Sequence, residues 1–217
     1  SKGRRSVEEP EAPAVKKGRN RSFIRVKWPT LPLDEVIDRL ESHRHAFDRV
    51  CLSMVTHKNA VADLVEMARR IRARVDVMLS ALITPTLTDR EGMIAIREAG
   101  IDRVGIAVDT ATPELFDKLR GRSAHGPHRW ERYWEGLADA ADVFGQYKAG
   151  CHLITGLGET EQEMVEVFGR LHDMGCVTHL FSFFPEAGSA LDSHEPPTMG
   201  HYRRIQLARY LVDEGIA

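Results

Sequence analysis

The segment Lys148-Ala-Gly-Cys-His-Leu-Ile-Thr-Gly-Leu-Gly-Glu-Thr160 combines an apolar run, two glycines and a helix start. Its first half, residues 148–154, predicts a strand that stops in a Gly-x-Gly turn, after which a helix begins. Gly156 and Gly158 allow a sharp turn that brings backbone N–H and C=O groups close to a ligand, where a Cβ would collide. Thr160 can cap the helix, and Glu159 suits its positive N-terminal end. A plain strand-to-helix turn would explain the same residues, so this unit alone leaves the function open.

Strands and helices alternate on both sides of this stretch. Apolar runs predict strands at Phe47–Val55, Val75–Ser80, Val104–Asp109, Lys148–Ile154 and Val177–Phe184. Helical periodicity appears at Leu33–Leu40, 59–73, 88–99, 113–142 (as two pieces), 159–174 and 199–214. Strands that alternate with helices of this length predict βαβ units and a parallel sheet.

The two faces of the predicted strands differ in polarity. In residues 104–109 the larger apolar side chains share one face, and Gly105, Ala107 and Asp109 share the other. The two strands before it divide in the same way. Strands covered by helices on both faces would be apolar on both, whereas the interior of a barrel that holds a ligand can be small or polar. We therefore expect an α/β fold built as a partial (β/α)6 TIM-like barrel of parallel strands, rather than an open doubly wound sheet.

The bulk composition indicates one globular domain without a nucleic-acid partner. The chain has 217 residues, 42% of them hydrophobic, and a net charge of −2. The charge is uneven, because residues 1–27 hold nine Lys or Arg against three Glu, a net charge of about +6. We expect residues 1–30 to be a basic loop or linker and residues 31–217 to form the barrel.

Sequence features also predict the compartment. No apolar run is long enough to span a membrane, and no signal-peptide pattern is present. The three cysteines, Cys51, Cys151 and Cys176, are widely spaced and include no Cys-x-x-Cys pair. They do not form a disulfide framework, which favours a reducing cytoplasm. The lack of a spanning apolar run predicts that the protein has no membrane partner.

Several stretches together resemble the radical S-adenosylmethionine (SAM) enzymes. Residues 154–159 resemble the fifth-strand motif of that family, in which backbone pairs with the adenine of SAM; His152 stands where the first glycine of the motif usually lies. Residues 105–110 are similar to the fourth-strand ribose motif of the biotin synthase group, with Asp109 at the carboxylate position and Ala107 in place of the usual Asn. The segments that follow the last strand also resemble this family, at residues 183–191 and 202–209.

The resemblance implies a SAM site built from Asp109, His152, Ile154, Gly156, Leu157, Gly158 and Glu159. Asp109 would bind ribose, and the backbone of Ile154, Gly156 and Leu157 would face adenine. Three alternatives stay open. Asp109 could instead cap the helix that begins near Thr112, His152 could be an ordinary interior histidine, and Glu159 could orient the loop without touching SAM.

The resemblance also implies a [4Fe–4S] cluster, whose ligands are absent from this sequence. The family uses three cysteines spaced Cys-x-x-x-Cys-x-x-Cys, and nothing here has that spacing. The first predicted strand resembles the family's second, so we expect strands 2–6 here, the first strand and the cluster loop outside these residues, and an inactive fragment. The alternative is a family member that has lost the cluster and serves as a binding or scaffold subunit.

Cys51 has a second interpretation within the same resemblance. In biotin synthase-like enzymes a second-strand cysteine helps to hold an auxiliary [2Fe–2S] cluster, and Cys51 matches that position. Met78 and Gly150 stand at the positions of the other two cysteines, and Cys151 falls on the opposite face of its strand. One ligand cannot hold a cluster, so an ordinary buried cysteine is favoured.

The basic opening narrows the subfamily. Together with Ser22-Phe-Ile-Arg-Val-Lys-Trp-Pro29, it resembles one subunit of a two-protein lipoyl synthase. That resemblance implies a transferase that inserts sulfur into a protein-bound octanoyl chain, with a second radical SAM subunit and an acidic lipoyl carrier protein as partners. The rivals are another radical SAM reaction and an aldolase- or isomerase-like barrel. The latter would want a lysine at a strand end, whereas Lys148 begins its strand.

Overall fold

The computed structural model describes residues 30–216. The predicted basic segment therefore lies outside the described residues, apart from its last position, as does the extended piece before Pro29. Contacts divide the described chain into a larger unit, residues 30–183 and 197–216, and the loop Phe184–Pro196. Turns close this loop, for example from the Ser189 N–H to the Glu186 carbonyl at 3.0 Å. The predicted domain boundary at residue 30 stays a prediction.

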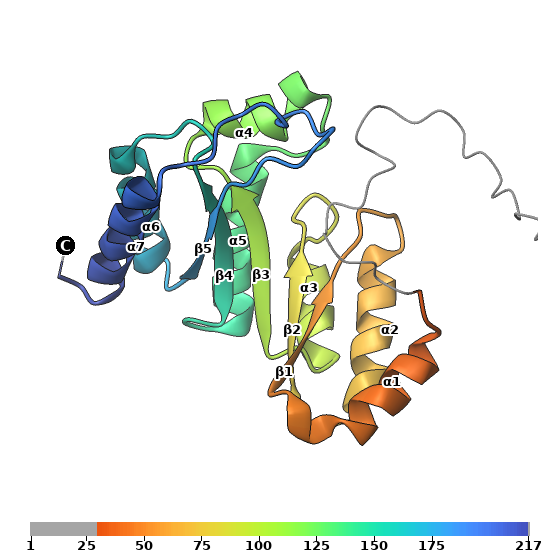
Figure 1. Cartoon of the computed structure of the whole chain (residues 1–217). Helices are drawn as coiled ribbons and strands as arrows, with labels where there is room; N and C mark the ends of the chain where they lie inside the picture. The colour runs from red at the N-terminus through yellow and green to blue at the C-terminus, as the bar shows by residue number, and fades with distance from the viewer. Residues whose placement is uncertain (1–29, 217) are drawn as a thin grey trace, which may run out of the picture. The chain divides into compact units, whose positions relative to one another are not determined.

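Five strands of the larger unit form one parallel sheet in the order β1-β2-β3-β4-β5 (Figure 1). They are β1 (Arg49–Ser53), β2 (Met78–Ile83), β3 (Arg103–Asp109), β4 (Ala149–Thr155) and β5 (Val177–Ser182). Each strand pairs with its neighbour in the chain, and a helical crossover lies between them. Right-handed crossovers that always advance in one direction leave their helices on one face, as in a barrel. A doubly wound sheet would reverse direction, so the expectation of barrel-type winding is confirmed.

The predicted helices are all present. They are α1 (Leu33–Ser42), α2 (Ala60–Arg72), α3 (Arg90–Glu98), α4 (Pro113–Leu119), α5 (Trp130–Phe144), α6 (Glu161–Asp173) and α7 (Met199–Asp213), with short 3-10 turns η1 (Arg44–Ala46) and η2 (Arg122–Ala124). The long helical pattern at 113–142 is two pieces, as expected. Figure 1 shows α3 and α5 behind the strands.

Helix starts follow local hydrogen-bonding rules. Thr160 caps α6 in a capping box: its hydroxyl accepts from the Glu163 N–H at 3.2 Å, and the Glu163 carboxylate accepts from the Thr160 N–H at 2.7 Å. Asp89 caps α3 by accepting from the Gly92 N–H at 2.8 Å. These partners are only three residues apart, so their pattern is visible in the sequence.

The core lies between the sheet and the helices that cover one face of it. On β3, Val104, Ile106 and Val108 are 3%, 0% and 0% exposed on the helix side. Gly105, Ala107 and Asp109 alternate with them on the other face and are only half-buried, as their period-2 spacing predicted. That second face, the interior face of the sheet, is the one that a closed barrel would enclose.

The second strand lies later in the chain than its apolar alternation predicts. The pattern predicts a strand at Val75–Ser80, whereas β2 begins at Met78 and ends at Ile83. The Val75 N–H still donates to the Ile71 carbonyl at 2.8 Å, so this backbone belongs to the end of α2. Pairing with β1 begins only where Met78 meets Arg49. Tertiary pairing sets the boundary here, not the apolar alternation.

Within residues 30–216, no helix combines the length and the apolar character needed to cross a bilayer. The cytoplasmic location stays a prediction.

Candidate functional site

The tips of β3 and β4 hold most of the predicted site residues. The register of this strand pair shifts between Ala107 and Asp109 and ends where Asp109 meets Leu153. Asp109 has a φ of +69°, which non-glycine residues rarely adopt. Such a bulge redirects a side chain at the end of a strand. Ile154 lies one residue beyond the last pair, so the two tips separate at the C-terminal edge of the sheet.

The Asp109 carboxylate is half-buried and held by one cation. Its Oδ2 accepts from Nη1 of Arg120 at 2.7 Å, with the two side chains 25% and 20% exposed. Burial raises the pKa of Asp109 above its usual range, and the charge of Arg120 acts in the opposite direction. No described residue donates to Oδ1.

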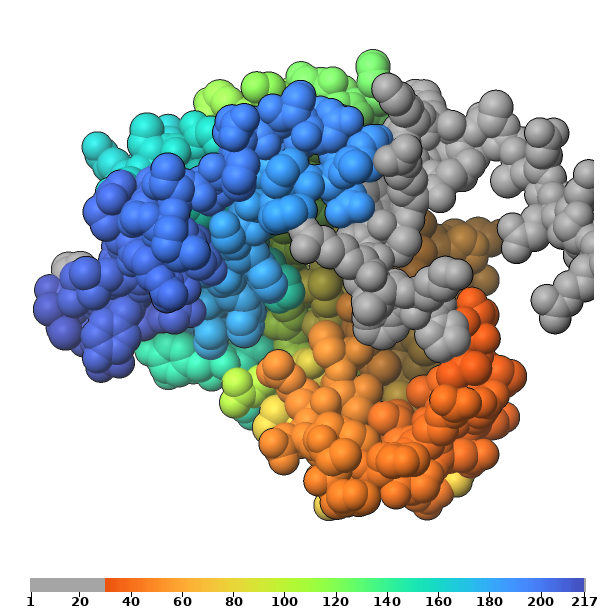
Figure 2. All heavy atoms as spheres, viewed as in Figure 1, coloured from red at the N-terminus to blue at the C-terminus, as the bar shows by residue number. Residues whose placement is uncertain are grey.

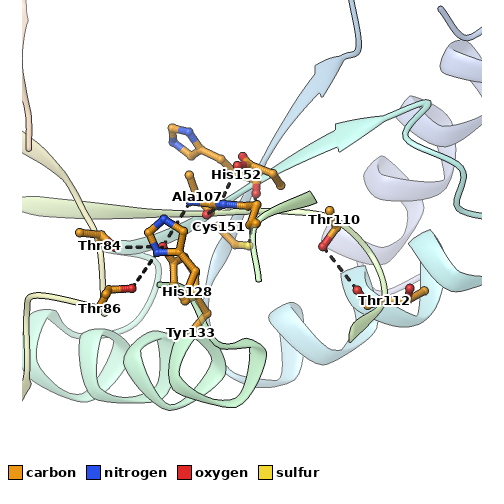
Figure 3. Close-up of polar contacts among 11 residues, drawn as sticks. Thr84, Thr86, Ala107, Thr110, Thr112, His128, Tyr133, Cys151 and His152 are labelled. Carbon is orange, nitrogen blue, oxygen red and sulfur yellow. Dashed lines mark hydrogen bonds and ion pairs between the residues drawn. The ribbon is translucent and has the colours of Figure 1, made fainter. Parts of the chain in front are cut away.

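The helix-cap interpretation of Asp109 is wrong. Thr112 caps α4 instead, because its hydroxyl accepts from the Leu115 N–H at 3.2 Å. Thr110 also bonds locally, to the Thr112 carbonyl at 3.4 Å (Figure 3). The Asp109 carboxylate therefore bonds to Arg120 and can accept further hydrogen bonds from a ligand at the strand tips.

A network that sequence reasoning missed holds Arg120. Its guanidinium donates to the Ala107 carbonyl and to the Tyr133 hydroxyl, the latter at 3.2 Å. It also lies over the rings of Phe116 and Tyr133, with centroid distances of 5.6 and 5.1 Å. These residues come from the α4–α5 region, and no motif marked them. The one sequence signal for this network is a basic residue, Arg120, that follows the ribose-type motif.

The same network continues toward β2. The Tyr133 hydroxyl lies 2.9 Å from Thr84 Oγ1 and 3.0 Å from Nδ1 of His128, which is in turn 2.8 Å from Thr86 Oγ1 (Figure 3). Burial and the positive charges of Arg120 and Arg129 lower the pKa of His128, which favours its neutral form. The network thus ties the tips of β2 and β3 to α5.

Glu159 orders the predicted adenine loop from within. Its side chain is 9% exposed and accepts from the Gly156 N–H at 2.6 Å and the Leu157 N–H at 2.9 Å. Two backbone donors that could have faced a ligand are therefore bonded to the protein itself. The expectation that Glu159 orients the loop agrees with this geometry.

Packing and backbone conformation explain why residue 156 is a glycine. Its φ is +98°, and a Cβ at this position would lie 2.5 Å from Cδ of Pro197. Gly158 has a φ of +119°, with its nearest neighbour, Leu115, at 3.5 Å from an added Cβ. Packing against Pro197 and backbone conformation therefore explain these glycines without invoking a ligand that approaches closely.

His152 lies apart from the tips, lower on the interior face. It pairs in register with Ala107 and His179, and its ring centroid is 5.1 Å from that of His179 and 5.2 Å from that of Phe181. Figure 3 shows it on the opposite side of the strands from Tyr133. Burial, reinforced by His179, lowers the pKa of His152 to about 4. Neither ring nitrogen has a hydrogen-bond partner among the described residues, so His152 is not a satisfied core histidine.

The described residues do not fit an iron–sulfur cluster. Within residues 30–216, no group of three or more His, Cys, Asp or Glu side chains is placed to hold a metal. Cys151 and Cys176 are buried, and burial raises the pKa of both thiols, that of Cys176 to about 11. Cys51 is exposed on the interior face, so the expectation that it is an ordinary buried cysteine is wrong. β1 is an edge strand, since among the described strands it pairs only with β2, and its interior face is therefore exposed.

Comparison with known proteins places these features in a family. Residues 17–171 match the model of the radical SAM superfamily. The chain is 37% identical to the GTP 3',8-cyclase of Microcystis aeruginosa over 67 residues, which are 30% of this chain and 20% of that protein. It is 27% identical to the GTP 3',8-cyclase of a Cyanothece species over 134 residues, 61% of this chain and 40% of that protein.

Structural similarity agrees at the level of the fold. A crystal structure of methylornithine synthase superposes with a TM-score of 0.65 at 14% identity, over 83% of this chain and 52% of that one. The matches to the two GTP 3',8-cyclases cover about a fifth and about two fifths of the length of those proteins. Because those relatives are GTP cyclases, the narrower resemblance to biotin and lipoyl synthases stays a prediction.

Proposed function

Because the chain belongs to the radical SAM superfamily, we propose that the tips of β3 and β4 bind the nucleoside part of SAM for radical chemistry. Membership in this family implies SAM and a [4Fe–4S] cluster, which together generate a 5'-deoxyadenosyl radical. The described residues supply no ligand set for the cluster. Their proposed work is to bind and orient the nucleoside.

The observation that carries the proposal is the state of the Asp109 carboxylate. Arg120 fixes one oxygen at 2.7 Å, and no described residue donates to the other. The side chain is 25% exposed at the C-terminal edge of a parallel strand, where barrels place their chemistry. A carboxylate fixed in this way can accept hydrogen bonds from ribose hydroxyls, and such charge-assisted bonds are the stronger class.

The loop after β4 suits the adenine base. Glu159 occupies the amides of Gly156 and Leu157, so the loop cannot offer these donors. No described residue donates to the Leu157 carbonyl, and the Ile154 backbone extends beyond the last pair with β3. Backbone acceptors at these two residues would meet the 6-amino group of adenine. Gly158 would shape the space beside them without being required for this contact, and His152, which lies lower on the interior face, would not take part in it.

Binding experiments on the whole chain test this assignment. We expect Asp109→Asn to weaken the binding of 5'-methylthioadenosine about tenfold, measured by isothermal titration calorimetry, since a charge-assisted hydrogen bond is lost. The wild type should bind the 2'-deoxy analogue more weakly than 5'-methylthioadenosine. The variant should bind the two ligands with equal affinity, because it no longer recognises the ribose diol. Asp63→Asn makes the same chemical change on an exposed carboxylate of α2 and should leave affinity unchanged. Equal binding of both ligands by the wild type would contradict the proposal.

For the reaction, we propose sulfur insertion into a protein-bound octanoyl chain, together with a second radical SAM subunit and a lipoyl carrier protein. The support is the resemblance of residues 22–29 and the basic opening, which suits an acidic carrier. The second candidate is a ring-forming reaction on a purine nucleotide, favoured by the 27% identity to a GTP 3',8-cyclase over 134 residues. Anaerobic product analysis of the full-length protein with each substrate separates the two. A lack of 5'-deoxyadenosine with either would favour a cluster-free binding subunit.

A further inference from the structure

Two glycines on the interior face make room for two histidine rings. Gly105 and Gly150 pair in register in the middle of β3 and β4. A Cβ at Gly105 would lie 3.1 Å from Nε2 of His152, and a Cβ at Gly150 would lie 2.8 Å from Nε2 of His179. Glycine weakens the interior of a strand unless the space it leaves is used. Here the imidazoles use it, and they lie directly against the sheet.

The two imidazoles offer polar atoms that the protein does not use. His152 and His179 are neighbours in register, with ring centroids 5.1 Å apart. No described residue forms a hydrogen bond with a ring nitrogen of either. Burial lowers the pKa of both, so each is neutral near pH 7 and carries one donor and one acceptor. His152 is half-buried and His179 is exposed, so water can bond to their ring nitrogens, and a ligand with polar atoms of its own can replace that water.

The cavity above these rings is bordered by unpaired positive charge. It has a volume of about 210 Å³, and Arg49, Arg103 and Lys148 line it along with both histidines. No Asp or Glu lines it. Figure 2 shows the central strands recessed on this face of the molecule.

These cations differ from most other arginines of the described chain. Arg72, Arg74, Arg90 and Arg120, for example, each form ion pairs. None of the three cavity cations has an ion pair among residues 30–216. The charges of Arg49 and Arg103 also help to lower the pKa of His179, which places them near that ring. The cavity is therefore a locally positive site with no compensating carboxylate.

We propose that this cavity binds an anionic group of the substrate, a phosphate or a carboxylate. Arg49, Arg103 and Lys148 hold the anion, and His152 and His179 form hydrogen bonds with the polar atoms next to it. That this ligand is the substrate rests on the second candidate reaction of the proposed function, because a purine nucleotide carries phosphates whereas an octanoyl chain carries no anionic group. The cavity also lies on the same face of the sheet as the Asp109 carboxylate. Anion binding itself does not depend on SAM.

Titration of the whole chain with inorganic pyrophosphate and, separately, glutarate tests the site. Long-range ¹H–¹⁵N spectra report the imidazole nitrogens, and His152→Gln and His179→Gln assign the signals. We expect one or both anions to shift the signals of both rings saturably. The double variant Arg49→Gln, Arg103→Gln should weaken binding about tenfold, because two charge-assisted contacts are lost. The tighter anion identifies the group.

Matched variants make the outcome decisive. Arg69→Gln removes an exposed charge on α2 that has no described ion pair, and it should leave binding unchanged. Equal losses in this variant, no imidazole shift with either anion, or binding only of an acidic carrier protein would overturn the proposal. Thermal unfolding confirms that the variants fold. Asp109→Asn should leave anion binding intact, so failure of the SAM assignment and failure of the anion site are distinguishable.

Discussion

The strand tips and the interior cavity use their polar groups differently. At the tips, Glu159 bonds two loop amides, and Arg120 holds Asp109. In the cavity, two neutral imidazoles have no described hydrogen-bond partner, and the neighbouring cations have no described ion pair. Both regions lie on the same sheet, but the first is preorganised by the protein and the second is left for a ligand to complete.

The strand tips are the more rigid of the two regions. Preorganised groups keep their geometry when a ligand arrives, so less ordering is needed on binding. Groups without protein partners bond to water until a ligand replaces it, and a ligand that pairs with them stabilises the folded protein. We therefore expect substitutions at the tips to change stability more than substitutions in the cavity do.

We expect the largest difference in stability between glycine-to-alanine substitutions at the tips and in the cavity. Gly156→Ala should destabilise the protein by about 2–4 kcal/mol, because its Cβ would meet Pro197 in a backbone conformation that alanine disfavours. Gly105→Ala should cost less than about 1 kcal/mol, since His152 borders a cavity into which it can shift and alanine reduces unfolded-state entropy. Urea unfolding of both variants measures this. Similar costs would break the distinction between a packed tip and an open cavity.

Removal of the Arg120 guanidinium tests how much stability the ion pair at the tips provides. Arg120→Met should destabilise by about 2 kcal/mol at pH 7, because a half-buried carboxylate loses its only described partner. The pKa of Asp109 should rise further, and adding Asp109→Asn should restore part of the loss. As a control, Arg39→Met breaks an exposed pair with Glu35, 62% and 43% exposed, and should change stability by less than about 0.5 kcal/mol. A double variant no more stable than Arg120→Met would show that the ion pair is unimportant.

A pH dependence of stability should come from the cavity. The pKa of His152 is about 4 in the folded protein, against an ordinary value of 6.5. Its contribution to stability is thus present above pH 6.5 and lost as the pH falls toward 4, because the unfolded chain takes up the proton first. His152→Gln should reduce the fall in unfolding free energy between pH 7 and pH 4.5. An unchanged fall would contradict the low pKa.

Local features of the site were readable because their partners are close in the chain. The cap at Thr160 and the orienting role of Glu159 involve residues within three positions of each other. The alternation of β3 also predicted which side chains face the interior, since strand geometry fixes a period of two. These features do not depend on how distant segments meet.

Features that depend on distant segments escaped the sequence. Arg120 reaches Asp109 only because α4 ends beside the tip of β3, so the sequence left a helix cap as an alternative. His179 and His152 meet through strand register, and their 27-residue separation carries no motif. The start of β2 likewise follows from its pairing with β1.

The order of strands and helices, the polar and apolar faces and the family resemblance could be predicted from the sequence, because periodicity and short motifs act over a few residues. Which polar groups already have protein partners is visible only in the folded chain. A hydrogen bond or ion pair requires two groups within about 3–4 Å, and that distance is set by register and crossover packing between segments far apart in the chain.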